Sequence, residues 1–219
     1  MFSTTSKKIS FAGLLTDVGD LLEADRGETI YHPGAPSNCV YFAESGRVKL
    51  AYLDESGKKL TLTIVDADEI FGEMCLVGEK HRRHLATAIE ETIVRCIDKP
   101  TFLRTIGESP NGFQILVQHF AARMREYEES LEDLAFRDIQ ARLSRQLLKL
   151  SDEYGEETKD GILIGLSVTH KELADMIGSA RENTTLALNR FAREGILEKS
   201  RYRIVIKNEA GLRKKITTL

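Results

Sequence analysis

Two short helices joined by a tight turn are encoded near the end of the chain. Thr169 followed by Glu172 has the spacing of a capping box, in which each side chain satisfies a backbone amide at a helix start. Ser179 followed by Glu182 has the same spacing, so a second helix is predicted to begin there. Gly178 lies between the two signals and can take the left-handed conformation that ends a helix. This arrangement predicts a helix-turn-helix.

The second of these helices has two chemically different faces. At about 100° per residue, four residues fall together and are expected to pack inward: Thr184, Ala187, Leu188 and Phe191. The opposite face carries guanidinium, carboxylate, hydroxyl and amide groups, which can bond base edges in the major groove of DNA. We therefore expect DNA contacts from that face and from the two helix starts: Thr169, His170, Ser179, Arg181, Glu182, Thr185 and Asn189.

The segment after the second helix predicts a wing. Residues 196–199 and 202–206 have the composition of two short strands. Basic side chains in this hairpin suit backbone phosphates, and we expect Arg201 and Arg203 to contact DNA. Residues 162–219 hold 11 basic and 6 acidic residues, although the whole chain has a net charge of −3. The local excess indicates a nucleic-acid-binding region that the total charge hides.

The remainder of the chain is acidic and rich in strand signals. The first 136 residues hold 15 basic and 22 acidic residues. Within residues 27–97, short runs of Val, Ile, Thr, Tyr and Phe are separated by glycines, which is typical of a barrel or jelly roll. Residues 59–65 alternate between apolar side chains and threonines, which predicts a half-buried strand with its apolar side inward. Gly57 is expected in the hairpin turn before that strand.

Composition and cysteine usage exclude several classes of protein. A hydrophobic fraction of 42% with 30% charged residues excludes fibrous and largely disordered chains. No apolar run reaches the ~20 residues that span a bilayer, and the N-terminus lacks a secretion signal. The three cysteines have no CxxC spacing, which disfavours a disulfide framework and a zinc site. We therefore expect a cytoplasmic protein with no membrane partner and no metal centre. We expect no enzyme activity either, because no HExxH, nucleophile–base grouping or Gly-rich nucleotide loop is present.

A long helix with a heptad pattern is predicted at 109–136. Ser109 and Pro110 are expected to start it, as N-cap and first helical residue. Apolar residues then recur in steps of four and three, which makes one narrow stripe of the kind found in coiled coils. We expect this stripe to join two copies of the chain, and the alternative is that it packs on the chain's own β domain. The predicted interface residues are Val117, Phe120, Met124, Tyr127, Leu131 and Leu134.

The rest of the chain divides around this helix. A further helix is expected at 139–150, followed by a polar surface loop at 151–161. The predicted domains are therefore 1–108 for the β domain, 109–136 for the dimerisation helix and 137–219 for the DNA-binding domain.

This order of elements resembles the CRP/FNR superfamily of bacterial transcription regulators. The resemblance rests on the segments GETIYHPG, FGEMCLVG, RRHLATA, LAFRDIQARL and HKELADMIGSARENT. It implies an α+β fold: an N-terminal antiparallel β jelly roll of the cyclic-nucleotide-binding type, a long dimerisation helix and a C-terminal winged helix-turn-helix. It also implies a homodimer gated by a small effector and bound to a pseudo-palindromic site on double-stranded DNA. RNA polymerase is the further partner that the resemblance implies.

The resemblance also implies an effector pocket. In the cyclic-AMP-binding branch a Phe-Gly-Glu segment and a following Arg-Ser-Ala hold the nucleotide, and residues 71–73 match the first segment. The pocket arginine would be Arg82 or Arg83, but the Ser-Ala is absent, and residues 127–128 are Tyr-Glu where that branch has Thr-Ser. A cyclic nucleotide stays open as the effector, and 2-oxoglutarate, held by one arginine, is an alternative. The implied pocket residues are Gly72, Glu73, Met74, Arg82, Arg83, His84, Arg123 and Tyr127.

Other branches of the superfamily provide further alternatives. Residues 1–38 contain no cysteine, so the iron–sulfur cluster of the oxygen-sensing branch is not expected. The segment GSARENTTLALN also resembles the carbon-monoxide-sensing haem branch, which makes Cys75, His81 and His84 candidate haem ligands; alternatively, Cys75 fills the core and the histidines lie on an exposed loop. A cyclic-nucleotide-binding module that acts on a protein partner is a further alternative. Leu186 stands where the family has a second DNA-reading arginine, so one base contact is expected to differ.

Overall fold

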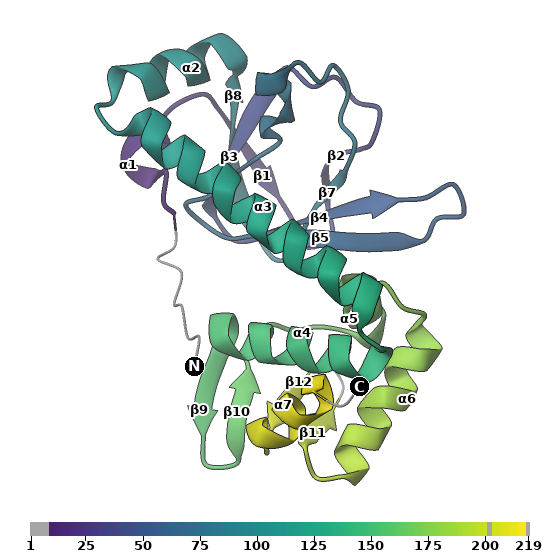
Figure 1. Ribbon diagram of the computed structural model, residues 1–219. Coiled ribbons are helices and arrows are strands. Elements are labelled where there is room, and N and C mark those ends of the chain that lie inside the picture. The colour runs from purple at the N-terminus through teal and green to yellow at the C-terminus, as the bar shows by residue number, and fades with distance from the viewer. Residues whose placement is uncertain (1–8, 201–202, 218–219) are drawn as a thin grey trace. The chain divides into compact units, whose positions relative to one another are not determined.

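The computed structural model describes residues 9–200 and 203–217 (Figure 1). The chain forms two compact units, one that ends at Glu126 and one that begins at Tyr127. The first is a β roll with flanking helices, and the second is a winged helical domain, so the predicted α+β fold is confirmed. Within the described ranges, none of the helices has both the length and the apolar character that a membrane span requires.

Two four-stranded antiparallel sheets form the β roll. One sheet has the strand order β1-β8-β3-β6, and the other has the order β2-β7-β4-β5. The strands are β1 (Asp20–Ala24), β2 (Thr29–Tyr31), β3 (Cys39–Ser45), β4 (Val48–Leu53), β5 (Lys59–Val65), β6 (Ile70–Phe71), β7 (Leu85–Ala88) and β8 (Thr92–Asp98). The jelly roll predicted from residues 27–97 is therefore confirmed, with β1 as an additional strand.

The strand predicted at 59–65 is present as β5, but its buried side is the opposite one. Thr63 and Val65 are buried, whereas Leu60 is only half-buried. The inner face of β5 is decided by its pairing with the buried residues of β4, which the alternation of residue types does not reveal. The predicted hairpin turn is confirmed, with Gly57 at a φ of 81° between the two strands.

Two clusters of buried side chains form the core of this unit. One packs strands against α1 (Ala12–Leu15), α2 (Lys99–Glu108) and the first turns of α3 (Gly112–Phe136), with Phe11, Phe42 and Phe102 among its members. The other draws on strands of both sheets and includes Val48 and Phe71. These clusters remove large apolar surfaces from water and hold α3 against the roll.

The long helix begins later than the sequence predicts. Asp98 caps α2 by accepting the amide of Thr101 at 3.0 Å, and Ser109 ends α2 instead of capping α3. Helix α3 begins at Gly112, where an added Cβ would lie 2.1 Å from the carbonyl oxygen of Ile106. Only glycine fits this close turn. The Ser-Pro signal therefore belongs to the connection between two helices and not to a helix start.

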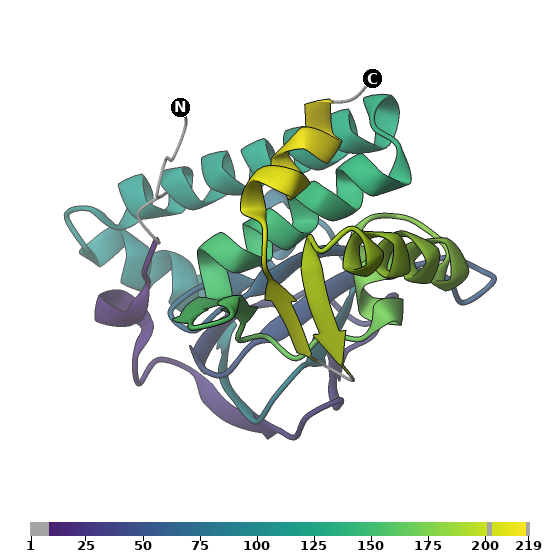
Figure 2. The ribbon, with the colours of Figure 1, turned by 90° about the horizontal axis from the view of Figure 1, so that it is seen from below.

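The second unit contains the predicted winged helix-turn-helix (Figure 2). After the end of α3 come α4 (Ile139–Tyr154), β9 (Gly155–Thr158), β10 (Gly161–Ile164), α5 (His170–Met176), α6 (Arg181–Arg193), β11 (Leu197–Ser200), β12 (Arg203–Ile206) and α7 (Glu209–Thr217). The strands form one antiparallel sheet in the order β11-β12-β10-β9, and α7 packs against α4. The prediction of a loop at 151–161 is wrong. This segment completes α4 and then forms β9, which pairs with β10.

Candidate effector pocket and DNA-binding surface

Arg82 lies inside the β roll at 5% exposure, whereas Arg83 is exposed. The Arg82 guanidinium donates to the carbonyl oxygens of Gly72, at 2.6 Å, and of Cys39, at 2.7 Å. An added Cβ at Gly72 would meet this guanidinium at 2.5 Å, so the glycine makes room for the arginine. The cation also lies over the rings of Tyr31 and Tyr41, at 4.7 and 5.1 Å from their centroids. Of the two candidate arginines, only Arg82 faces the interior of the roll.

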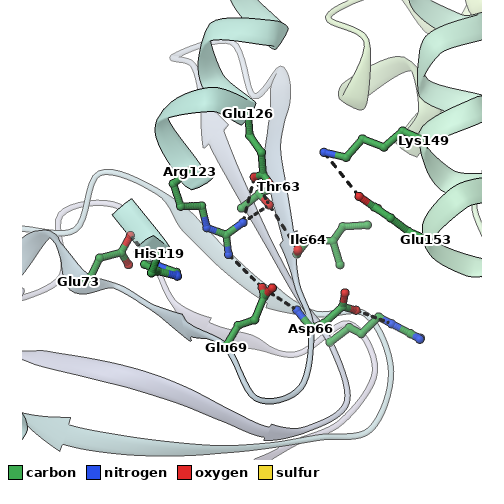
Figure 3. Close-up of polar contacts among 11 residues, drawn as sticks. Thr63, Ile64, Asp66, Glu69, Glu73, His119, Arg123, Glu126, Lys149 and Glu153 are labelled. Carbon is green, nitrogen blue, oxygen red and sulfur yellow. Dashed lines mark hydrogen bonds and ion pairs between the residues drawn. The ribbon is translucent and has the colours of Figure 1, made fainter. Parts of the chain in front are cut away.

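Glu73 is enclosed next to α3 and faces His119 (Figure 3). Glu73 Oε1 lies 3.7 Å from His119 Nε2, and the histidine ring packs edge-on against Phe11. Burial by itself raises the pKa of Glu73, but the interactions with His119 and the charge of Arg123 lower it below the usual glutamate value. The carboxylate is therefore held ionised within the roll, where it can accept a hydrogen bond from a ligand hydroxyl.

Arg123 anchors α3 to the roll through a polar network (Figure 3). Its Nη1 donates to Thr63 Oγ1 at 2.5 Å and lies 3.1 Å from Glu126 Oε2. Its Nη2 lies 3.2 Å from Glu69 Oε2. Arg123 is only 8% exposed, so two carboxylates offset a charge that burial would otherwise penalise. An effector that binds Arg123 has to compete with these partners.

The other predicted pocket residues are less enclosed. His84 packs edge-on against Tyr52, and burial lowers the pKa of its ring. Met74, in the short 3₁₀ helix η1 (Glu73–Val77), is exposed, and so is Tyr127 at the start of the second unit.

Four residues of this region were not predicted from the sequence: Thr63, Glu69, His119 and Glu126. His119 and Arg123 are four positions apart and so lie on one side of α3, beside the apolar stripe. A basic residue four positions before Arg123 is the signal from which His119 could have been predicted as a pocket residue. The sequence around Thr63 and Glu69 carries no comparable signal, because strand pairing brings these residues to the helix.

The three candidate haem ligands do not form a group. Cys75 belongs to the buried core cluster, and its thiol donates to the Cys39 carbonyl oxygen at 3.4 Å. His81 is exposed and forms an isolated β-bridge with Pro36. Across residues 9–200 and 203–217, no three His, Cys, Asp or Glu side chains are grouped so as to hold a metal ion.

The apolar stripe of α3 is open to solvent in the single chain. Val117, Met124 and Leu131 are 66%, 62% and 69% exposed, and Tyr127 and Leu134 are exposed as well. Phe120 differs, because it is half-buried against the core of the roll. A contiguous exposed apolar surface of this kind is typical of a protein interface.

One of the two predicted capping boxes is present. Thr169 Oγ1 accepts the amide of Glu172 at 3.1 Å, and the Glu172 carboxylate accepts the amide of Thr169 at 2.8 Å. The prediction of a second box is wrong, because Ala180 is the N-cap of α6 and Ser179 is buried. The amide of Ser179 donates to the carbonyl of Ala174 at 2.9 Å, so Ser179 belongs to the turn that ends α5.

Helix α6 has the two faces that the sequence predicts. Its buried residues are Thr184, Ala187, Leu188 and Phe191. The other side exposes Arg181, Glu182 and Asn189, and Thr185 is half-buried. Leu186 is 66% exposed on this side. Among the described residues, no hydrogen bond or ion pair engages the side chains of Arg181 and Glu182, so both remain available to a ligand.

His170 connects the two helices of the motif. Its Nδ1 lies 3.0 Å from Thr185 Oγ1 on α6. Burial, together with the nearby charges of Lys199 and Arg181, lowers the pKa of His170. The start of α5, α6 and the wing thus place several basic groups close together, which suits binding to an anionic polymer.

The predicted wing is present as β11 and β12. Arg203 is exposed on β12, whereas Arg201 lies outside the described residues. Lys207 follows β12 and is held by Glu198 at 3.0 Å and by Asp160 at 3.7 Å. The wing therefore offers Arg203 to a phosphate more readily than Lys207.

Comparison with known proteins identifies both parts of the chain. Residues 21–109 match the cyclic nucleotide-binding domain family, and residues 141–215 match the Crp-like helix-turn-helix domain family. A CRP-like cAMP-activated global transcriptional regulator of Mycobacterium tuberculosis is 30% identical, over 78% of this chain and 76% of that protein. A global nitrogen regulator of Synechocystis is also 30% identical, over 88% of this chain and 87% of that protein.

Solved structures agree with these sequence relatives. A CRP/FNR-family transcription regulator of Thermus thermophilus is similar at a TM-score of 0.76 and 27% identity, covering 91% of this chain and 99% of that one. A CooA variant from Carboxydothermus hydrogenoformans is similar at a TM-score of 0.81 and 25% identity, covering 94% and 90%. The similarity extends over both units.

Proposed function

Because the chain belongs to the CRP/FNR superfamily of transcription regulators, we propose that it acts as a homodimer whose DNA binding is gated by a small effector inside the β roll. The two copies bind a pseudo-palindromic site on double-stranded DNA, with half-sites about one helical turn apart. Arg181 and Glu182 contact base edges, and the bound dimer acts on RNA polymerase.

Helix α3 carries this proposal, because it bears both the exposed stripe and the buried network. Met124 is on the stripe, and Arg123, the residue before it, is in the network. Neighbouring residues of one helix are held at a fixed angle of about 100° to each other. A ligand that moves Arg123 therefore turns the stripe with it. A ligand that binds one packing of two such stripes more tightly than the other shifts the population toward it.

We propose a cyclic nucleotide as the effector. Gly72 and Glu73 match the nucleotide cassette of the family, and the similar M. tuberculosis protein is described as cAMP-activated. Glu73 would accept a ribose hydroxyl, and Arg82 would neutralise the cyclic phosphate. Arg82 has to leave the carbonyl oxygens of Gly72 and Cys39 to do so. 2-Oxoglutarate, held by Arg82, is the alternative.

The dimer is tested by sedimentation of Met124→Glu beside Gln118→Glu. Both variants add one negative charge to an exposed position of α3, but only Met124 lies on the stripe. We expect the wild type and Gln118→Glu to sediment as dimers and Met124→Glu as a monomer, with loss of DNA binding in a gel shift. A dimeric Met124→Glu would place the interface elsewhere.

The effector is tested by thermal unfolding with cyclic AMP, cyclic GMP, cyclic di-GMP and 2-oxoglutarate. A ligand that binds only the native state raises the melting temperature. We expect a cyclic nucleotide to do so in the wild type and not in Glu73→Gln. A rise with 2-oxoglutarate alone supports the alternative, and no rise with any of the four compounds contradicts both assignments.

A further inference from the structure

Two of the three cysteines meet inside the β roll. Cys39 begins β3, and Cys96 lies on the neighbouring strand β8. Cys39 is paired with Asp98 and Tyr41 with Cys96, so both cysteines project to the same side of the sheet. Cys96 Sγ lies 3.0 Å from Cys39 Sγ. The thiol of the third cysteine, Cys75, donates to the carbonyl oxygen of Cys39 at 3.4 Å.

Cys39 also lies against the buried guanidinium of Arg82. Arg82 Nη2 is 3.2 Å from Cys39 Sγ. Among the described residues no carboxylate forms an ion pair with Arg82, whose other partners are carbonyl oxygens and aromatic rings. A buried cation that lacks a counter-ion is costly. The thiolate form of Cys39 is the anion that this site can provide, so the surroundings favour it over the neutral thiol.

The environments of the three thiols differ accordingly. The hydrogen bond from Cys96 lowers the pKa of Cys39 most, and Tyr41 and Arg82 lower it further, although burial opposes them. The pKa of Cys96, which donates that hydrogen bond, is raised. Burial raises the pKa of Cys75. Because the thiolate is the reactive form of cysteine, Cys39 is the expected nucleophile and Cys75 is an internal control.

We propose that Cys39 and Cys96 form a peroxide-reactive pair that closes to an intramolecular disulfide, and that this modification removes the anionic partner of Arg82. The Cys39 thiolate attacks one oxygen of a hydroperoxide, the O–O bond breaks, and a sulfenic acid and a hydroxide form. That hydroxide takes the proton of Cys96 and becomes water. Cys96 then attacks the Cys39 sulfur, the S–O bond breaks, and the S–S bond forms as a second hydroxide leaves.

The step balances without a metal or cofactor. Two sulfur atoms lose two electrons in total, and hydrogen peroxide gains them and leaves as one water and one hydroxide. The sulfur atoms must approach from 3.0 Å to about 2.05 Å, the length of a disulfide bond. Disulfides that form in reduced compartments are commonly transient and redox-sensing. Neither an effector nor DNA takes part, so failure of this proposal leaves the proposed function untouched.

The test is a non-reducing peptide map of the full chain after treatment with hydrogen peroxide. Trypsin separates the three cysteines, because they fall in residues 27–47, 60–80 and 96–104. We expect the peptides 27–47 and 96–104 to be linked in a chain that still runs as a monomer on a non-reducing gel. The free thiols should fall from three to one per chain, with Cys75 intact. Three persisting thiols, a link to Cys75 or a link between chains would overturn the proposal.

Two variants and one rate measurement sharpen the result. Cys75→Ser should form the disulfide at the wild-type rate. Cys96→Ser should form none and should instead accumulate a Cys39 sulfenic acid, which dimedone traps. In the untreated wild type, the alkylation rate of Cys39 should be half-maximal below pH ~8.5, the pKa of a free thiol. This last measurement needs no substitution, so it decides the reactivity of Cys39 even if Cys96→Ser does not fold, and a midpoint at or above that pH contradicts it.

Discussion

The arginines of the β roll and those of the recognition helix have opposite environments. Arg82 and Arg123 are 5% and 8% exposed, and acceptors of their own chain surround them. Arg181 is exposed on α6 and has no partner among the described residues. A buried guanidinium is stable only when it is compensated, whereas an exposed one adds little to folding. The roll arginines therefore determine packing, and the α6 arginine remains available to DNA.

The largest expected effect is on the stability of the roll. Arg123→Ala leaves the carboxylates of Glu69 and Glu126 without their shared partner, which should lower the free energy of unfolding by about 3 kcal/mol. Arg125→Ala, at an exposed position of the same helix, should change it by less than about 0.5 kcal/mol. Urea denaturation measures the free energy of unfolding of both variants. Equal unfolding midpoints would show that the buried network of Arg123 contributes no more to stability than a surface arginine does.

The next effect is on DNA binding without loss of stability. Arg181→Ala should weaken binding to a specific site by about 1–3 kcal/mol, while its thermal unfolding stays as in the wild type. Arg104→Ala removes the same charge from an exposed position on α2 and should leave the affinity unchanged. Competition gel shifts against unrelated DNA measure the difference, and wild-type discrimination in Arg181→Ala contradicts base readout by this side chain.

A smaller effect on stability is expected at the two positions that the sequence predicts to be helix caps. Thr169→Ala removes a capping hydrogen bond and should cost about 1 kcal/mol of stability. Ser179→Ala removes a buried hydroxyl that has no hydrogen-bond partner among the described residues, so it should be neutral or slightly stabilising. Thermal unfolding of the two variants provides the comparison. A loss of stability in Ser179→Ala would show that its hydroxyl has a partner.

The smallest expected effect is a pH dependence of DNA binding. Burial and the charges of Lys199 and Arg181 lower the pKa of His170 in the free protein, and DNA phosphates should raise it again. Binding then takes up a proton, so affinity should rise as pH falls through the pKa of the bound state and level off below that of the free state. The gain should stay below about tenfold, the factor for one pKa unit. His170→Gln should abolish this pH dependence when DNA affinity is measured between pH 5 and 8.

Features that depend on residues close in the chain were predicted from the sequence. The capping box of Thr169 and Glu172, the inner face of α6 and the exposed stripe around Met124 each need only the periodicity of one helix. The division of charge along the chain likewise indicated the part that matches the Crp-like helix-turn-helix domain. The three helix predictions succeeded because the residues concerned lie within a few positions of each other.

Features that depend on distant partners were decided only by the tertiary structure. Ser179 has the sequence of a cap, but its amide is already bonded to Ala174. The inner side of β5 follows from its pairing with β4, and the choice of Arg82 over Arg83 follows from the space beside Gly72. The sequence alone determined which kinds of side chain this regulator has and on which elements they lie. Only the packing of the sheets decided which of them meet, because strand register brings together residues far apart in the chain. In this way it places Cys39 diagonally across from Cys96 on the neighbouring strand.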